Sequence, residues 1–271
     1  MSQTVYTDTV TIGRAGQHAD SGPGRVEGKA AENAITWGNV VQRGTSDNQF
    51  ASIAALPAAD ADAVATALAS AATAQTFVAA SFDGEIGAGL ITPPRTVRLL
   101  LNAHADWDAT LLQITYITAD GTEKTDIIPI PDAGDVILKT QSPVMRVVSI
   151  DLPAQTGTNG TIAVGVDNTE IALDRGHYPG VAMYTPGVEP STAAVGDVSA
   201  LLGVDVLVAG CIYVIVEAAV EAGMPCYVRM VESGTDLRGQ VRGDPAANFA
   251  RLVGASFKTS AAIDGLAILE V

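Results

Sequence analysis

The sequence is poor in the residues that carry most enzymatic and nucleic-acid chemistry. Its 271 residues include two cysteines, three histidines and two tryptophans, and aromatic residues make up 5% of the chain. Lysine and arginine total 15 against 30 aspartates and glutamates, a formal charge of −15. Nucleic-acid binding needs clustered basic residues that replace the counterions around phosphates. We therefore expect no nucleic-acid partner, and an acidic surface that favours solubility.

Long apolar runs are also missing. Apolar residues make up 48% of the chain, yet no run approaches the roughly 18–20 residues of a membrane span. The chain begins MSQTVYTDTVTIG, without a basic stretch followed by an apolar one, so we expect neither a secretory signal nor a membrane partner. Cys211 and Cys226 lie in apolar, strand-like runs and are expected in the core, although a disulfide between them stays open.

The motifs of common enzymes are absent or incomplete. There is no Gly-x-Ser-x-Gly elbow, and residues 22–30 (GPGRVEGKA) differ from a phosphate-binding loop at Pro23 and Ala30. His104, Asp106 and Asp108 alternate and could hold a metal on one face of a strand, but their turn-like spacing favours a solvated loop. We expect no enzymatic activity, no metal and no cofactor.

Glycine and proline divide the chain into short apolar runs, a pattern typical of an all-β protein. The most regular zone is residues 75–173, where Asp120-Gly121 is a strong hairpin signal. Six short strands in about 100 residues indicate an Ig-like β-sandwich. Trp107 and Tyr116 in this zone could line a carbohydrate-binding surface, although core packing is the simpler interpretation. The six predicted strands are 96–102, 110–118, 123–130, 136–140, 145–153 and 161–167.

One stretch has a helical composition. Residues 58–74 (AADADAVATALASAATA) are rich in alanine, the best helix former, and begin with aspartates that could cap a helix. Val64 and Leu68 lie four residues apart and would share a helix face. We predict a short connecting helix here.

The remaining zones flank the sandwich. Residues 13–34 are rich in glycine and have no strand or helix period, which indicates an extended arm that a partner orders, or a disordered segment. Residues 34–44 predict a strand pair around Gly38 and Asn39. Further strands are predicted at 180–185, 211–217, 225–232 and 266–271. Because both faces of 211–217 (CIYVIVE) are apolar, this strand is expected in a barrel or at a subunit interface. The expected oligomer contacts are Ile212, Tyr213, Val214 and Ile215.

These flanking zones resemble the structural cement protein family of tailed bacteriophages. The matching segments are 13–22 (GRAGQHADSG) with Glu27-Gly28, 34–44 (AITWGNVVQRG) with 47–49, 211–217 with 222–228 (AGMPCYV), and 254–262 with 265–271 (GLAILEV). The resemblance covers about residues 1–55 and 178–271. It implies a small β-rich protein that sits on the lattice of the major capsid protein, commonly as a homotrimer.

The sequence departs from this family pattern between the second segment and Gly180-Val181-Ala182, where the sandwich intervenes. We therefore predict an all-β chain: a small barrel-like base domain with an extended N-terminal arm and an inserted sandwich. The predicted parts are residues 1–74, the insert 75–173, and residues 174–271.

The expected function is that of a structural virion protein on the outer capsid surface, made in the host cytoplasm. It would stabilise the capsid by bridging major capsid protein subunits. The alternative is a binding module in which the insert recognises a host glycan or protein. The arm is slightly basic within an acidic chain. Its expected capsid contacts are Arg14, His18, Arg25 and Lys29.

Overall fold

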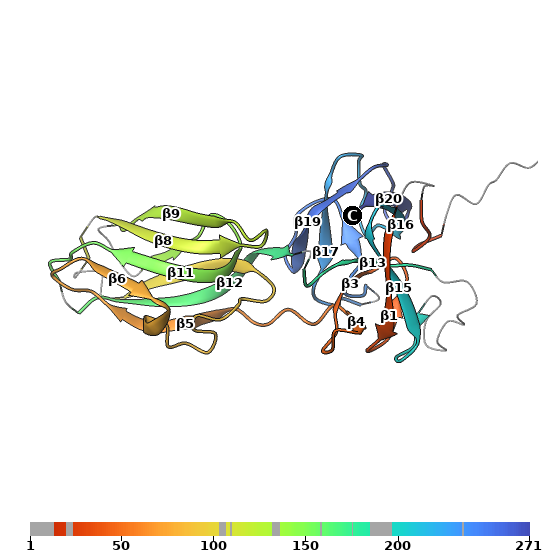
Figure 1. Cartoon of the computed structure of the whole chain (residues 1–271). Coiled ribbons are helices and arrows are strands. Elements are labelled where there is room, and N and C mark those ends of the chain that lie inside the picture. The colour runs from red at the N-terminus through yellow and green to blue at the C-terminus, as the bar shows by residue number, and fades with distance from the viewer. Residues whose placement is uncertain are drawn as a thin grey trace, which may run out of the picture. The chain divides into compact units, whose positions relative to one another are not determined.

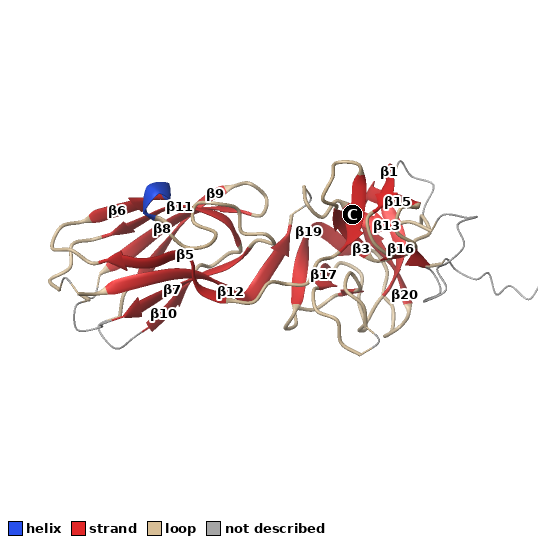
Figure 2. Ribbon diagram, turned by 90° about the horizontal axis from the view of Figure 1, so that it is seen from below, coloured by secondary structure: helices blue, strands red, loops and turns tan. Residues whose placement is uncertain are grey.

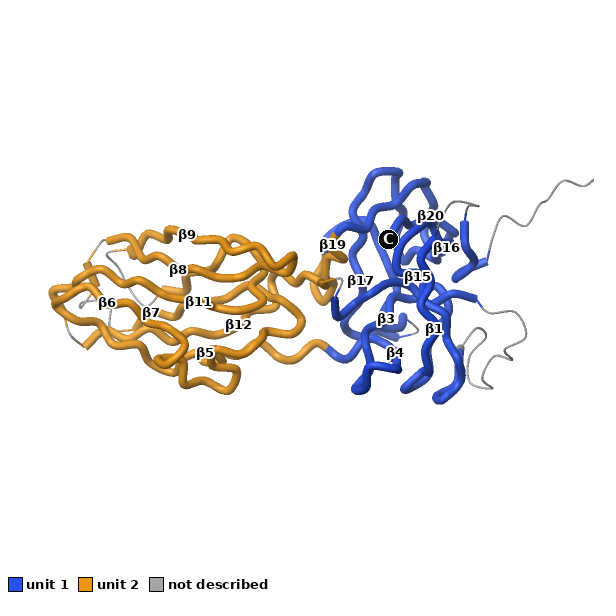
Figure 3. Tube along the Cα trace, viewed as in Figure 1, with its two compact units in different colours: residues 1–55, 176–245, 254–271 blue, residues 56–175, 246–253 orange. Residues whose placement is uncertain are grey.

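The computed structural model divides the chain into two compact units (Figures 1 and 3). Unit 1 comprises Met1–Ala55, Gly176–Pro245 and Gly254–Val271, and unit 2 comprises Leu56–Arg175 and Ala246–Val253. The structure describes residues 14–19, 24–102, 107–108, 110–131, 136–157, 159–174, 176–184, 197–234 and 236–271. Unit 2 is thus larger than the insert of residues 75–173 expected from the sequence.

The described residues form strands, turns and one short 3₁₀ helix, η1 (Ala79–Ser81), as Figure 2 shows. This confirms the predicted all-β class. Within the same described ranges, the structure holds no helix of the length and apolar character needed to cross a membrane.

Unit 1 contains a closed five-stranded barrel. Its strands follow the order β1 (Arg25–Ala31), β15 (Gly203–Ala209), β13 (Gly180–Ala182), β3 (Val40–Arg43) and β4 (Gln49–Ser52). Alternate side chains of β15 point inward, so Val204, Val206 and Val208 pack in the core beside Phe50. The barrel confirms the predicted base fold.

The rest of unit 1 packs as short antiparallel strands. Its strands are β2 (Ile35–Thr36), β14 (Asp197–Val198), β16 (Cys211–Ile215), β17 (Pro225–Arg229), β18 (Val241–Arg242), β20 (Leu266–Glu270) and part of β19 (Phe249–Phe257). β16 pairs with β20, and β17 with β18. The expectation that residues 34–44 pair with themselves is wrong, because β2 pairs with β14 whereas β3 pairs with β4 and β13.

The described residues of unit 2 form a β-sandwich of eight strands, and the first half of β19 pairs parallel with the end of β12. One layer holds β6 (Gln75–Val78), β11 (Val144–Leu152), β8 (Leu111–Thr118) and β9 (Glu123–Pro129), and the other holds β5 (Asp60–Ala69), β12 (Thr161–Leu173), β7 (Arg95–Asn102) and β10 (Val136–Lys139). The layers are joined by the residue pair Val144–Arg95. Both contribute to one core, which includes Leu99, Leu112, Ile114, Ile150 and Ile162. Gly121, with φ +80°, forms the predicted β8–β9 hairpin.

The predicted helix at 58–74 is wrong, because its central residues form strand β5. β5 pairs antiparallel with β12, with Leu68 opposite Ile162 and Ala65 opposite Val164. Val64 and Leu68 are buried in the sandwich core. Alanine favours a helix only weakly, and the pairing and burial available in the sandwich override that preference.

A buried arginine fixes the start of unit 2. Arg95, only 3% exposed, donates from Nη1 to the carbonyl oxygens of Pro57 and Ala58 at 3.0 and 3.2 Å and to Asn168 Oδ1 at 2.9 Å. Asn168 Nδ2 also donates to Pro57 O at 3.1 Å. The segment before β5 is therefore part of the sandwich.

Candidate interaction surfaces

The arm segment, defined here as residues 14–19, lies along the edge of β16. The amide of Gly16 donates to the carbonyl oxygen of Tyr213 at 2.8 Å, and that of Ala19 donates to Cys211 O at 2.8 Å. An uncovered sheet edge presents unpaired backbone groups that invite pairing with another chain. The arm segment thus satisfies the edge of β16 in the way an added strand would.

Aromatic rings hold the start of the arm segment. The Arg14 guanidinium lies 4.8 Å from the centroid of the Tyr184 ring, which meets Trp37 edge-on at 4.7 Å. Gly16 has φ +78°, and a Cβ built there would lie 2.7 Å from Tyr184 N. Glycine is therefore required at this position. His18 forms a β-bridge with Ile212.

Arg25 and Lys29, the other two residues expected to contact the capsid, lie outside the arm segment. Arg25 and Lys29 belong to β1, a strand of the barrel that pairs with β15, so the predicted extended arm is wrong for residues 25–31. Arg25 Nη2 donates to Glu27 Oε1 at 2.8 Å, and Lys29 Nζ donates to the carbonyl oxygen of Asp47. The glycine-rich composition of this stretch does not predict strand β1, which forms because it pairs with β15 in the barrel.

Strand β16 presents different faces to the core and to solvent. Ile212 and Val214 are fully buried within the unit, whereas Tyr213 is half-buried and Ile215 is 46% exposed. Ile212 and Val214 are core residues of unit 1, so their side chains are not accessible to a second copy of the chain. Contact with another subunit stays a prediction for Tyr213 and Ile215.

The outward side of β16 continues onto β20. Tyr213 lies opposite Ile268 and Ile215 lies opposite Leu266, and all but Ile215 are half-buried. We call these four residues the outer β16–β20 face. Cross-strand neighbours on one face of an antiparallel pair lie about 4.5–5.5 Å apart at Cβ, so the four form a continuous apolar patch.

A comparison with known protein families identifies the family to which the chain belongs. The model described as Structural cement protein (E217 gp24/Pam3 gp6) matches residues 117–271, more than half of the chain. The chain belongs to the phage structural cement protein family. It is a non-enzymatic virion component of the kind the sequence resemblance implied. A search of curated proteins gives no match.

The matched residues differ from those that carried the resemblance. They include the C-terminal segments 211–217, 222–228, 254–262 and 265–271, but also run through the sandwich from the end of β8. Residues 1–116 lie outside the match. The family resemblance of the arm and of residues 34–44 therefore stays a prediction for this cement protein.

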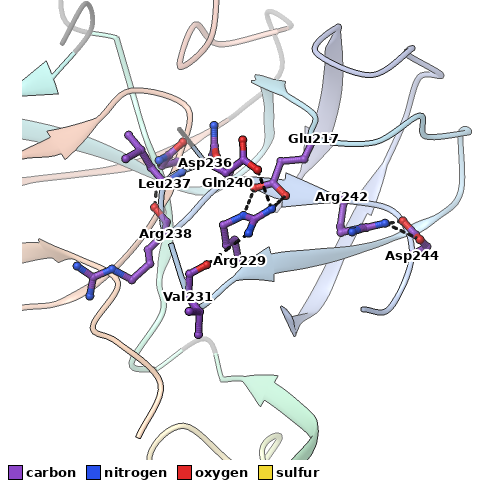
Figure 4. A network of polar contacts seen from close by, with 10 residues as sticks. Glu217, Arg229, Val231, Asp236, Leu237, Arg238, Gln240, Arg242 and Asp244 are labelled. Atoms are coloured by element: carbon purple, nitrogen blue, oxygen red, sulfur yellow. Dashed lines mark hydrogen bonds and ion pairs between the residues drawn. The ribbon is translucent and has the colours of Figure 1, made fainter. Parts of the chain in front are cut away.

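A nearly buried ion-pair network organises the region after β17 of the cement protein (Figure 4). Arg229 donates from Nε and Nη2 to the two carboxylate oxygens of Glu217 at 2.6 and 2.7 Å, and from Nη2 to Asp236 at 3.1 Å. The hydrogen bonds to Glu217 raise the pKa of Arg229. Arg229 Nη1 also donates to the carbonyl oxygen of Val231, and the side chains of Val231 and Leu237 are exposed at the surface.

Sequence reasoning missed this network, because Glu217 and Arg229 stand twelve positions apart and belong to no motif. The signal present in the sequence was weak: Glu217 ends the run 211–217, and Arg229 lies inside the strand expected at 225–232. Only the packing of the two strands brings them together.

The aromatic residues of the sandwich are core residues. Trp107 is 3% exposed and its Nε1 donates to Asn102 O at 2.7 Å. Tyr116 is fully buried and donates to Asp126 Oδ2 at 2.9 Å. Burial and this hydrogen bond raise the pKa of Tyr116 to about 12. The core interpretation is therefore right, and neither ring is available to stack on a sugar.

The remaining motifs also have structural explanations. Residues 25–30 of the phosphate-loop-like stretch form β1. His104 and Asp106 lie outside the described residues, while Asp108 accepts hydrogen bonds from Thr156. No metal-binding group of three His, Cys, Asp or Glu occurs within the ranges the structure describes.

Both cysteines are free rather than joined in a disulfide. Cys226 is fully buried, and burial raises the pKa of its thiol. Cys211 is half-buried. The expectation of a core residue is thus confirmed for Cys226 and holds only partly for Cys211.

Proposed function

We propose that this cement protein binds the outer surface of a tailed-phage head and stabilises it by bridging neighbouring major capsid protein subunits. The observation that carries the proposal is the family match over residues 117–271, which includes β13–β20. The charge of −15 supports an outward position, because a DNA-facing surface would suffer repulsion from the packaged phosphates.

We further propose that the chain acts as a homotrimer through the outer β16–β20 face. Ile215 and its three half-buried neighbours leave an apolar patch in contact with water. Burying such a patch against a second copy is favourable. A trimer would also engage several capsid subunits at once, and modest contacts would then add through effective concentration.

The arm supports the same role. Arg14 is exposed and belongs to a segment anchored on β16. We propose that Arg14, His18, Arg25 and Lys29 contact the capsid, the first two from the arm segment and the last two from strand β1.

Sedimentation of undecorated heads tests the proposal. Purified chain is mixed with heads that lack it, the heads are pelleted, and bound chain is measured against its free concentration. We expect saturable binding and a higher temperature of head rupture. Binding that never saturates, or heads that rupture at an unchanged temperature, would contradict a stabilising role.

One observation favours a second function for unit 2. Leu111 and Ile127 are 58% and 55% exposed on the neighbouring strands β8 and β9. An exposed apolar pair suits a protein ligand better than a glycan. We propose that this face binds a host-surface protein. A virion carrying the Leu111→Ser, Ile127→Ser double variant should keep its decoration but adhere less to host cells, and unchanged adhesion would exclude this face.

A further inference from the structure

A leucine of unit 1 has a backbone conformation that suits other residue types. Within the described ranges, three non-glycine residues have positive φ: Leu201 at 69°, Asn248 at 67° and Asp264 at 58°. Asparagine and aspartate visit this left-handed region readily, because their short side chains bond to the local backbone. A leucine there is disfavoured, because its Cβ lies too close to the following carbonyl oxygen.

The side chain of Leu201 gains nothing within this chain in return. It is 79% exposed, more than any other large apolar residue the structure describes, and Leu202 beside it is 44% exposed. Folding alone would favour glycine or asparagine at position 201. Backbone strain at a position whose side chain stays largely in solvent points to a role in binding.

The turn that carries Leu201 is held firmly. It connects β14 to β15, and Leu201 N donates to Ala31 O at 2.7 Å while Ala31 N donates to Leu202 O at 2.8 Å. Both bonds join the turn to the end of barrel strand β1. The exposed leucine is therefore presented in one orientation, which lowers the entropy lost when a partner binds it.

The chemistry of the turn defines what it fits. Residues 199–203 (SALLG) are uncharged within an acidic chain, and Ala200 and Gly203 allow close approach on either side of the leucines. A buried apolar side chain in a partner's pocket is a typical binding anchor.

Neither of two cavities in the described part of unit 1 suits this anchor. Two cavities of unit 1, of about 310 and 170 Å³, both have charged side chains in their lining, including Glu32 and Arg43 in the first and Glu232 and Arg238 in the second. Leucine in either would remove those charges from water at a cost. These two cavities are therefore poor receptors for the leucine, whereas an apolar pocket on a partner would suit it.

We propose that Leu201 is an apolar anchor that inserts into a pocket on the capsid shell. This inference rests on the proposed function and names the residue through which unit 1 holds the head. Leu202 widens the contact, and the hydrogen bonds to Ala31 keep both side chains directed outward.

The test replaces Leu201 by residues that fit its backbone better. Leu201→Gly and Leu201→Asn are each measured for binding to undecorated heads, thermal unfolding and oligomeric state by light scattering. We expect head binding at least about 10-fold weaker, since an anchor contributes more than 1.4 kcal/mol. The unfolding temperature should stay the same or rise, and the oligomeric state should not change. Leu90→Asn is the matched control, because Leu90 is 60% exposed in unit 2.

Each other outcome overturns the inference. If the variants bind heads as tightly as the wild type, Leu201 is not an anchor, while the proposed function is unaffected. A lower unfolding temperature in both variants shows a structural role, and a changed oligomeric state identifies a second copy as the partner. If the wild-type chain does not bind heads, the proposed function itself fails and the anchor with it.

Discussion

Arg229 and Glu217 form a two-point ion pair in which the guanidinium meets both carboxylate oxygens at 2.6 and 2.7 Å. Their side chains are only 12% and 8% exposed. The pair joins β17 to the chain that follows β16, and so connects the region of the outer β16–β20 face to residues 230–240. Because both side chains are nearly buried, removing either one would leave the other charge without a partner and largely out of water.

Removing one member of this pair should destabilise unit 1 strongly. Glu217→Ala leaves a nearly buried guanidinium without its main partner, and we expect the free energy of unfolding to fall by about 3–5 kcal/mol. Replacing both residues, as in Glu217→Leu with Arg229→Met, should cost much less, because no charge is left unpaired. Denaturant unfolding measures both effects.

The control for this experiment is Arg242→Ala. Arg242 pairs with Asp244, whose side chain is 52% exposed, and exposed pairs contribute about 0–1 kcal/mol. Equal losses in Glu217→Ala and Arg242→Ala would show that burial does not strengthen the Glu217–Arg229 pair.

Two N-terminal truncations should distinguish the contribution of the arm from that of the barrel. Deleting residues 1–13 spares every strand of the barrel, so we expect cooperative melting to persist while head binding weakens. Deleting residues 1–30 removes most of β1, which pairs with β15 and β4, and should unfold the barrel. Circular dichroism and head sedimentation distinguish the two forms. A folded protein without residues 1–30 would contradict the barrel's dependence on β1.

Excision of residues 56–175, the larger of the two segments of unit 2, should succeed only at these limits. Both ends of the excised segment meet β3: Ala54 N donates to Gln42 Oε1 at 2.9 Å, and Arg43 N donates to His177 O at 2.8 Å. A short Gly/Ser linker in place of residues 56–175 can therefore join them at little entropic cost. We expect this form to melt cooperatively and to bind heads.

Excision of residues 75–173 is the informative comparison. It retains β5 and leaves Val64 and Leu68 without the sandwich core that buries them. We expect this form to aggregate. The boundaries at 56 and 175 would be wrong if both excised forms melted with equal cooperativity.

The homotrimer proposal makes a prediction at Ile215. A charge on the outer β16–β20 face would be buried in the interface, so Ile215→Asp should shift the mass measured by light scattering from trimer to monomer. The control Ile127→Asp places the same charge at a site 55% exposed in unit 2. A monomeric wild-type protein at capsid-like concentrations would remove the basis for this interface.

The sequence predicted strands best where turns bounded them. The strand expected at 123–130 is β9 (Glu123–Pro129), and that at 96–102 is β7 (Arg95–Asn102). Alternating apolar residues and hairpin glycines act over a few positions, so they are visible locally. β5 was missed because its alanines favour a helix in isolation, and only pairing with β12 makes it a strand.

Candidate contact residues were less predictable than strands. Ile212 and Ile215 look alike in the sequence, yet one is fully buried and the other is 46% exposed. Leu201 carries no sequence signal at all, because its distinguishing feature is a backbone angle set by hydrogen bonds to Ala31. Such features depend on how distant strands meet.

The most direct test of the central claim is a cryo-EM reconstruction of heads incubated with the chain. The proposed function predicts density for the protein on the outer surface, in three-fold groups that each contact more than one major capsid protein subunit. Absence of added density, or density on the inner, DNA-facing surface, would contradict it.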